Sequence, residues 1–289
     1  MTERPLDPWD QTPKANSPSM IVIEAKRGLI KLDWRSLWEY RELIYFMVWR
    51  DVKARYKQAA LGVAWAILQP LLTMVIFTVI FSHVAQVPSH GISYPIFAFA
   101  ALVPWTYFSQ AVSRTGVGVV GTANLISKVY FPRLIIPLSA AATPLVDFVL
   151  AFIVLLGLMV WYQHVPPAEL VFLPAFTLMA FLAAIAIGIW LSALNVRYRD
   201  VQYLIPFLVQ TGMLASPVAY PVSLVPAQWQ SIYALNPMVA VIEGFRWCLL
   251  GAPAPSFEMI SLGMLTTLVF LLGGVAYFNA TERTFADIV

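Results

Sequence analysis

The sequence predicts an all-α integral membrane protein, with six transmembrane helices, an N-terminal amphipathic interface helix and an external re-entrant helical hairpin between the last two spans. Hydrophobic residues make up 60% of the 289 residues and charged residues only 11%, whereas a soluble domain carries about 25% charged residues. Six apolar stretches each reach the roughly 20 residues needed to cross a hydrocarbon core. Because lipid offers no partner to backbone polar groups and these stretches do not alternate in polarity, we expect helices.

The predicted transmembrane domain covers residues 61–289. Its six spans lie at about residues 61–82, 93–112, 136–161, 170–194, 201–222 and 258–278. Prolines are expected to kink or break several of these spans, because proline removes a backbone donor. Asp147 is the only ionisable residue well inside a span. It is interpreted either as a proton relay or as a polar contact to a neighbouring helix.

Lysine and arginine are distributed unevenly between the two faces that six spans create. Seventeen of the 18 lie in residues 1–60, in the segments after the second and fourth spans, and in the C-terminal tail; only Arg246 lies on the opposite face. The positive-inside rule makes the crowded face cytoplasmic and places both termini there. We expect no cleavable signal sequence, because residues 1–60 are polar and charged and contain no short apolar core.

The first 60 residues divide into two parts. Residues 1–33, rich in Pro, Asp and Ser, are predicted to form a flexible cytoplasmic tail. Residues 34–60 are predicted to form an amphipathic interface helix, since three tryptophans and other apolar residues share an arc of about 140° opposite a basic face. Arg41 and Arg55 interrupt the apolar stripe. Such a helix is either a passive anchor or a surface that lies beside a cytoplasmic partner.

The sequence "NVRYRDV", residues 195–201, forms the predicted cytoplasmic turn between the fourth and fifth spans. Arginines at the membrane surface anchor helices, and this explanation is sufficient for Arg197 and Arg199. Asp200 needs a further reason. It can cap the helix that opens the fifth span, or it can orient one guanidinium toward another protein.

Proline interrupts the fifth span near its outer end. Ser216-Pro217 and Tyr220-Pro221 both place a residue without a backbone donor where a straight helix would continue. Broken helices are tolerated at membrane depth where protein or a cavity surrounds them. The breaks therefore favour a hairpin that enters the membrane from outside over a helix that rests on the lipid surface.

The predicted return limb of this hairpin is a helix of about 14 residues, which is too short to span the membrane. Asn236 is a good N-cap, Pro237 suits the first helical position, and Gly251 is a stop signal. Glu243 and Arg246 are three residues apart, so they share a face and can pair.

Catalytic and metal-binding patterns are not found in the sequence. His83, His90 and His164 lie near the external ends of spans at spacings that match no metal motif. Cys248 is the only cysteine, so no intrachain disulfide can form. The sequence "GVGVVG" at residues 116–121 matches a dinucleotide-binding pattern, but a membrane helix precedes it instead of a strand. Close helix packing explains these glycines better.

Several short sequences, in order along the six spans, resemble the membrane subunit of ABC-2 type polysaccharide exporters, which move O-antigen, capsule and teichoic-acid polymers. The resemblance covers the chain from about residue 34 to its end. It rests on "LIYFMVWRDVKARYKQAALGVAWAILQPL" at the first span, "NLISKVYFPR" at 124–133, "NVRYRDV" at 195–201, "SPVAYP" at 216–221, "LNPM" at 235–238 and "FAD" at 285–287.

The resemblance implies a division of labour between subunits. Members form homodimers in the bacterial cell (inner) membrane, and two copies of a cytoplasmic ABC ATPase bind ATP and Mg²⁺ and drive transport. This chain would bind no cofactor or metal, would catalyse no reaction, and would contact membrane lipids but no nucleic acid. The polysaccharide, often still on a polyprenyl lipid carrier, would pass between the two membrane subunits.

The resemblance also implies roles for particular residues. Coupling to the ATPase is expected of Arg197, Tyr198, Arg199, Asp200, Lys128, Phe131, Pro132 and Arg133. Aromatic rings offer sugars an apolar face and a polar edge, and the candidates for the substrate pathway are Trp65, Phe77, Phe81, Tyr203, Phe207 and Tyr220. The candidates for an external gate are Ser216, Pro217, Pro221, Asn236, Pro237, Glu243 and Arg246.

Two other functions compete with an exporter subunit. A secondary transporter would need intramembrane charges for ion coupling, and only Asp147 is available. A membrane-embedded transferase acting on lipid-linked sugars would need clustered acids or histidines at the membrane surface, and the sequence contains no such cluster.

Overall fold

The computed structural model describes residues 34–57, 62–122, 125, 128 and 131–288. Every regular element in this part of the chain is a helix. The predicted tail, residues 1–33, lies outside the described residues. The α-helices are α1 Trp34–Glu39, α2 Arg41–Lys57, α3 Gly62–Phe77, α4 Tyr94–Gly121, α6 Ile135–Ala142, α7 Leu145–Trp161, α8 Leu173–Arg197, α9 Val201–Leu214, α10 Ala227–Tyr233, α11 Pro237–Leu250 and α12 Phe257–Ile288.

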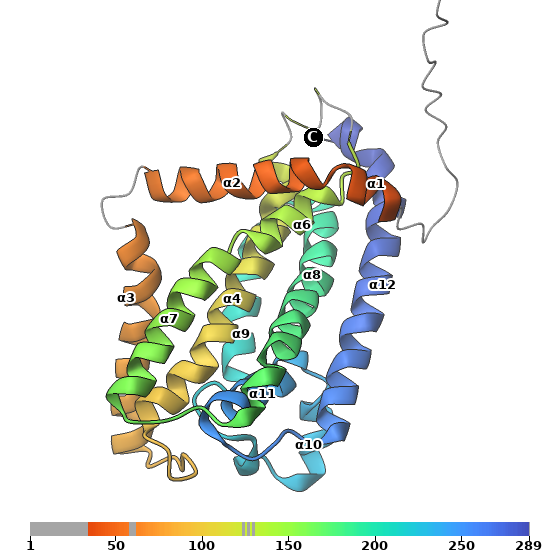
Figure 1. Ribbon diagram of the computed structural model, residues 1–289. Helices are drawn as coiled ribbons and strands as arrows, with labels where there is room; N and C mark the ends of the chain where they lie inside the picture. Colours follow the sequence, from red (N-terminus) through yellow and green to blue (C-terminus); the bar gives the residue numbers. More distant parts are fainter. Residues whose placement is uncertain (1–33, 58–61, 123–124, 126–127, 129–130, 289) are drawn as a thin grey trace, which may run out of the picture.

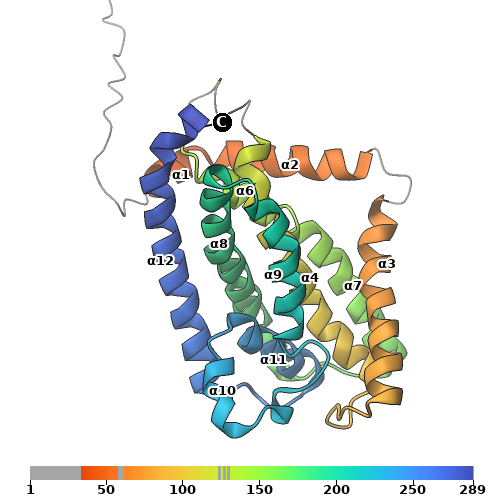
Figure 2. The ribbon, with the colours of Figure 1, turned by 180° about the vertical axis from the view of Figure 1, so that it is seen from behind.

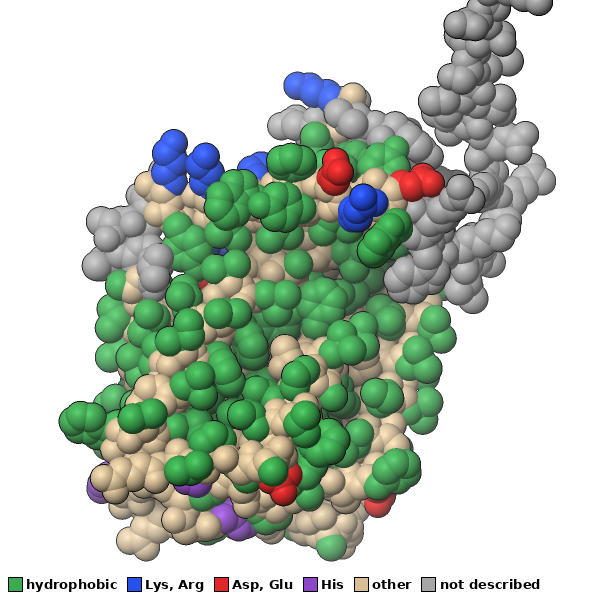
Figure 3. Space-filling model, in the orientation of Figure 1, with side chains coloured by type: hydrophobic (Ala, Val, Ile, Leu, Met, Phe, Trp, Pro, Cys, Tyr) green, Lys and Arg blue, Asp and Glu red, His purple; other side chains and the backbone are tan. Residues whose placement is uncertain are grey.

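The long helices run side by side around α4, while α2 lies across one end of the bundle and α10 and α11 lie at the other (Figures 1 and 2). We call these the α2 end and the α11 end. In the most apolar 18-residue stretch of α4, 78% of the residues are buried inside the protein. In the corresponding stretch of the span that begins in α3, the buried share is 17%. Lys and Arg side chains gather at the α2 end of the visible face and histidines at the α11 end (Figure 3). This distribution matches the charge asymmetry in the sequence.

Within the described residues, five segments are long and apolar enough to cross a membrane: 64–84, 94–121, 135–161, 168–197 and 257–282. They coincide with five of the six predicted spans. The first ends in a π-helix, Thr78–Val84, and the fourth begins with a 3-10 helix, Ala168–Phe172. The third is divided into α6 and α7 at Thr143-Pro144.

The fifth predicted span is shorter than expected. Helix α9 has 14 residues and ends at Leu214, so it covers only about 21 Å at 1.5 Å per residue. Helix α9 thus ends two residues before the predicted break at Ser216-Pro217, and the rest of the predicted span to residue 222 is not an α-helix. Pro217 has no backbone N–H to continue the helix, and the Ser216 hydroxyl donates to the Gly212 carbonyl at 2.8 Å. Beyond it, only Val222–Leu224 is helical before α10 begins.

The predicted interface helix is divided into α1 and α2, which are separated at Tyr40, and α2 packs against α6 and α3. Met47 is 4% exposed and faces the bundle, whereas Tyr45 and Trp49, two apolar residues of α2, are 63% and 54% exposed. Exposed aromatic side chains are what a helix in the membrane interface presents to lipid, so the interface helix stays a prediction.

Close packing explains one of the glycines in residues 116–121. A Cβ on Gly116 would lie 2.5 Å from Cδ1 of Ile205 on α9 and 3.3 Å from Cβ of Leu191 on α8, so a larger residue there would displace the Ile205 side chain. A Cβ on Gly121 would meet nothing within 4 Å. Gly188 on α8 likewise lies against Thr115, where a Cβ would approach to 2.6 Å. These contacts let α8 and α9 lie close to α4, as small residues do in membrane bundles.

Candidate functional site

The predicted short external helix is present, and its boundaries are those expected. Helix α11 begins at Pro237, after Asn236, whose side chain accepts a hydrogen bond from the Met238 amide at 3.0 Å. It ends before Gly251, which adopts the left-handed conformation at φ 66°. Thirteen of its 14 residues are buried, Trp247 being the exception, because α8, α4 and α12 surround it. Helix α11 is therefore an internal element of the bundle.

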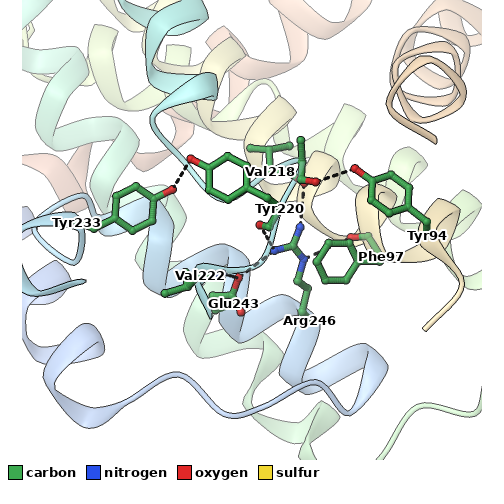
Figure 4. Close-up of polar contacts among 9 residues, drawn as sticks. Tyr94, Phe97, Val218, Tyr220, Val222, Tyr233, Glu243 and Arg246 are labelled. Atoms are coloured by element: carbon green, nitrogen blue, oxygen red, sulfur yellow. Dashed lines mark hydrogen bonds and ion pairs between the residues drawn. The ribbon is translucent and has the colours of Figure 1, made fainter. Parts of the chain in front are cut away.

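Arg246 and Glu243 form the predicted pair on α11, and both are buried. Nη1 of Arg246 lies 2.9 Å from Oε1 of Glu243, and the Arg246 side chain has no exposed surface. The guanidinium also lies over the Phe97 ring of α4, at 3.6 Å from the ring centroid (Figure 4). A buried charge of this kind needs both a counter-ion and further hydrogen bonds to be tolerated.

Those further hydrogen bonds go to the backbone that follows α9. Arg246 donates from Nη2 to the Val218 carbonyl at 2.9 Å and from Nη1 to the Tyr220 carbonyl at 3.1 Å. Its Nε donates to the Phe97 carbonyl at 3.4 Å. One guanidinium thus links α11, α4 and the non-helical segment 215–221, and it provides donors for carbonyls that no helix satisfies.

Three other contacts hold the same segment (Figure 4). The Tyr94 hydroxyl donates to the Ala219 carbonyl at 2.7 Å. The Val222 amide donates to Oε1 of Glu243 at 3.4 Å, and the hydroxyls of Tyr220 and Tyr233 lie 3.0 Å apart. We call this group of contacts, centred on Arg246, the Arg246 network.

The residues predicted for an external gate lie in or beside the Arg246 network. Ser216, Pro217 and Pro221 are buried, and the Asn236 side chain donates to the Ser216 hydroxyl at 2.8 Å. The sequence contained the signal for the Glu243–Arg246 pair through its spacing. The carbonyls of Tyr220 and Val218 lie 26 and 28 positions from Arg246, and no pattern in the sequence predicts their contact with it.

The turn "NVRYRDV" is exposed at the α2 end, between α8 and α9. Arg197, Tyr198, Arg199 and Asp200 are all exposed, and the Arg197 guanidinium lies 5.5 Å from the centroid of the Tyr198 ring. Asp200 precedes α9, but its side chain makes no capping hydrogen bond. The capping role considered for Asp200 is therefore wrong.

The other predicted coupling residues differ in exposure. Lys128 is exposed, Phe131 is buried, and Pro132 is half-buried. Arg133 donates to the Glu282 carbonyl, and its Nε lies 3.8 Å from the Glu282 carboxylate. Arg133 thus links the segment before α6 to the end of α12.

Asp147 has charged and polar partners that the sequence analysis missed. Nη1 of Arg55, in the last turn of α2, donates to one carboxylate oxygen, and the Tyr56 hydroxyl donates to the other. The same Nη1 lies 3.1 Å from Oε1 of Gln110 on α4. The only available signal was Arg55 itself, because it interrupts the apolar stripe of its helix. With both oxygens engaged, Asp147 makes the polar contact to a neighbouring helix that was one of its two interpretations.

The aromatic candidates do not form one cluster. Trp65 on α3 and Tyr203 and Phe207 on α9 are exposed. Phe77 and Phe81 pack edge to face at 5.3 Å; Tyr220 belongs to the Arg246 network. Helices α3 and α9 both pack on α4, and they stand apart from each other in Figure 2. Within the described residues, no three His, Cys, Asp or Glu side chains lie together as a metal site would need.

The chain is similar to known transport proteins over most of its length. A family model, described as ABC-2 type transporter, matches residues 42–250. The O-antigen export system permease protein RfbA of Myxococcus xanthus is 30% identical over 259 residues, which are 88% of this chain and 98% of that protein. The polysialic acid transport protein KpsM of Escherichia coli is 27% identical over 81% of this chain and 91% of its own length.

A third relative, the capsule polysaccharide export inner-membrane protein CtrC of Neisseria meningitidis serogroup B, is 23% identical over 86% of this chain and 95% of its own length. These matches confirm the resemblance seen in the sequence. The five long apolar helices agree with a multi-pass membrane protein. The chain belongs to the ABC-2 type transporter family.

Proposed function

We propose that this chain is the membrane-spanning subunit of an ATP-driven exporter that moves a polysaccharide, or a polysaccharide on a polyprenyl lipid, out of the cytoplasm. The observation that carries the proposal is the match, over at least 81% of the chain, to permeases named for O-antigen, polysialic acid and capsule export. All three cargoes are polysaccharides. Two copies of the chain would act with two copies of a cytoplasmic ATPase, which would bind ATP and Mg²⁺ in place of this subunit.

A homodimer with a path between its subunits would use exposed faces of α3 and α9. Only 17% of the most apolar stretch of the span that begins in α3 is buried, and α9 exposes Tyr203, Phe207 and Leu214. Such apolar side chains face either lipid or a second copy of the chain, because lipid tails are as apolar as leucine. In this proposal a second copy covers part of these faces, while Trp65, Phe77, Phe81, Tyr203, Phe207 and Tyr220 offer rings to sugars along the path.

The α2 end is the proposed cytoplasmic side, with both termini inside, and α9 with the segment 215–221 makes a sixth crossing. Cysteines at Ala168 and Ser223 are expected to react with an impermeant thiol reagent added outside intact cells. Cysteines at Lys128 and Asp200 should react only after permeabilisation. All four positions are exposed, and the native Cys248 is buried, so background labelling should be low. Labelling of the second pair in intact cells would reverse the proposed orientation.

The exposed turn 195–201 is the proposed contact with the ATPase, together with Lys128, Phe131, Pro132 and Arg133. An arginine well buried at a protein interface is worth about 2 kcal/mol or more. Because lysine lacks the planar fork of arginine, Arg199→Lys should lower both co-purification of the ATPase and the amount of polysaccharide at the cell surface. Arg50→Lys on α2 is the matched control and should export normally. Arg199→Glu should fail to export whether Arg199 anchors the turn in the membrane or couples it to the ATPase. Normal export by Arg199→Lys would make this turn a membrane anchor only.

A further inference from the structure

Arg114 on α4 is a charged residue for which the described chain provides no partner. It is half-buried and makes no hydrogen bond or ion pair among the described residues. It interacts electrostatically with Arg55, Tyr56, Asp147 and Asp51. Both acids are already engaged: Asp147 by Arg55 and Tyr56, and Asp51 by Arg50 at 2.8 Å. A guanidinium held in a transmembrane helix without a counter-ion is unfavourable.

The charges around Arg114 do not balance. Arg50, Arg55 and Arg114 contribute three positive charges, and Asp51 and Asp147 contribute two negative charges. One positive charge therefore remains at the place where α2 crosses α4. A single monovalent anion would neutralise it.

Several unused donors lie around this excess charge. Arg55 donates to Gln110 and Asp147 through Nη1 alone, so its Nε and Nη2 have no partner among the described residues. Gln110 accepts through its side-chain oxygen, and its side-chain NH₂ group has no such partner. Gln110 and Arg114 are four residues apart on α4 and share one face. Among the described residues, the only buried side-chain polar atoms without a partner are Nε2 of His164 and Oγ of Ser192. The unused N–H groups of Arg55, Gln110 and Arg114 must therefore reach the molecular surface.

We propose that Arg114, Arg55 and Gln110 bind the phosphate of a lipid at the α2 end of the bundle. Two oxygens of a phosphate accept the two parallel N–H bonds of the planar guanidinium, and a phosphodiester carries the one negative charge that the cluster lacks. A phosphate carried by a lipid reaches this place because α2 lies across the bundle beside the membrane-embedded length of α4 (Figure 1). The lipid phosphate bridges α2 and α4 and completes the contact that Arg55 makes to Asp147. None of the aromatic candidates for the substrate path belongs to this site, and lipid binding here can be tested whether or not the proposed function holds.

Binding can be measured on the full chain by native mass spectrometry in detergent. The probes are phosphatidylglycerol, phosphatidic acid, undecaprenyl phosphate, and a phosphate-free galactosyl diacylglycerol. Arg114→Gln should weaken binding of the phosphate lipids by about tenfold or more, since a hydrogen bond to a charged group corresponds to at least that factor. Gln110→Leu removes one neutral donor and should cause a loss of about threefold. The galactolipid should bind weakly to every variant.

Arg50→Gln is the matched control, because Arg50 is an exposed arginine on α2 that already pairs with Asp51. It should bind the phosphate lipids within about twofold of the parent chain, since exposed ion pairs contribute little. A preference for undecaprenyl phosphate over phosphatidic acid, which is also a phosphomonoester, would identify a carrier-lipid site, and equal binding a general phospholipid site; both support the proposal. The proposal is overturned if Arg114→Gln binds the phosphate lipids as well as the parent chain does, or if Arg50→Gln loses as much lipid binding as Arg114→Gln. It is also overturned if inorganic phosphate occupies the site and none of the phosphate lipids does.

Discussion

Replacement of Arg246 by leucine should unfold the chain at a markedly lower temperature than its parent. Removing one partner of a buried ion pair costs about 3–5 kcal/mol, and Glu243 would remain buried with only the Val222 amide as a donor. The carbonyls of Val218 and Tyr220 would lose their donor as well. Tryptophan fluorescence during heating of the purified chain in detergent measures the change.

A double variant separates the two roles of Arg246. Buried ion pairs can often be replaced by apolar residues of similar volume without loss of stability, so Glu243→Leu with Arg246→Met removes the charge problem. If Arg246 chiefly holds the segment 215–221, this double variant should remain about 1–3 kcal/mol less stable, because its carbonyls stay unpaired. Full recovery would limit Arg246 to neutralising Glu243. Arg197→Leu, at an exposed arginine, should change stability by about 0.5 kcal/mol or less.

The proposed gate adds a transport readout to the same network. Glu243→Arg places two like charges on neighbouring positions of one helix face and should loosen the segment 215–221. We expect altered polysaccharide export or an ion leak through the membrane at a normal protein level. A variant that keeps its export and conducts no ions would restrict the Arg246 network to stability.

Replacement of Asp147 by leucine should have the second large effect, because it releases α2 from the bundle. Arg55 would lose its counter-ion at a position where 29% of its side chain is exposed, and the Tyr56 hydroxyl would lose its acceptor. Breaking an ion pair between fully buried charges costs about 3–5 kcal/mol. Because Arg55 is partly exposed, we expect the free energy of unfolding to fall by only about 2–3 kcal/mol. Protease sensitivity of the α2 segment in native membranes measures the release.

An exchange of the two charges tests whether the pair itself is what matters. Arg55→Asp with Asp147→Arg keeps one positive and one negative charge, and it should recover part of the protection that either single variant loses. Asp200→Asn is the matched control, because Asp200 is exposed and makes no capping hydrogen bond. Equal sensitivity of the single and exchanged variants would contradict a direct contact between these side chains.

The spans were predictable from the sequence because length and apolar content follow directly from the thickness of a bilayer. The limits of α11 were predictable too, since Asn236, Pro237 and Gly251 act within one turn of its ends. Helix α9 ends two residues before the predicted break at Ser216-Pro217, but the path of the chain beyond this end depends on more than its own sequence. The carbonyls beyond Leu214 are held by Tyr94 and Arg246, from helices distant in the chain.

The same distinction explains the polar contacts. Glu243 and Arg246 are three positions apart, and helical periodicity alone brings them together. Arg55 and Asp147 are 92 positions apart, and no local pattern links an arginine in an interface helix to an acid in the third span. Which apolar side chains of α2 are covered by protein depends on the position of α6 and α3, and periodicity along one helix does not give that position.

The central position of α4 has a consequence for the way this protein is made. Helix α4 is the second long apolar helix to leave the ribosome, yet α8 and α11, which bury it, follow much later. Phe97 and its partner Arg246 are 149 positions apart, which corresponds to roughly 7–30 s of synthesis at 5–20 residues per second. Helices α3, α6 and α7 can pack on α4 during this interval, but the face that α11 covers has no protein partner until α11 is made. A nascent chain that stalls before α11 would therefore present an unfinished α4 to the membrane, where insertion factors and quality-control proteases meet it first.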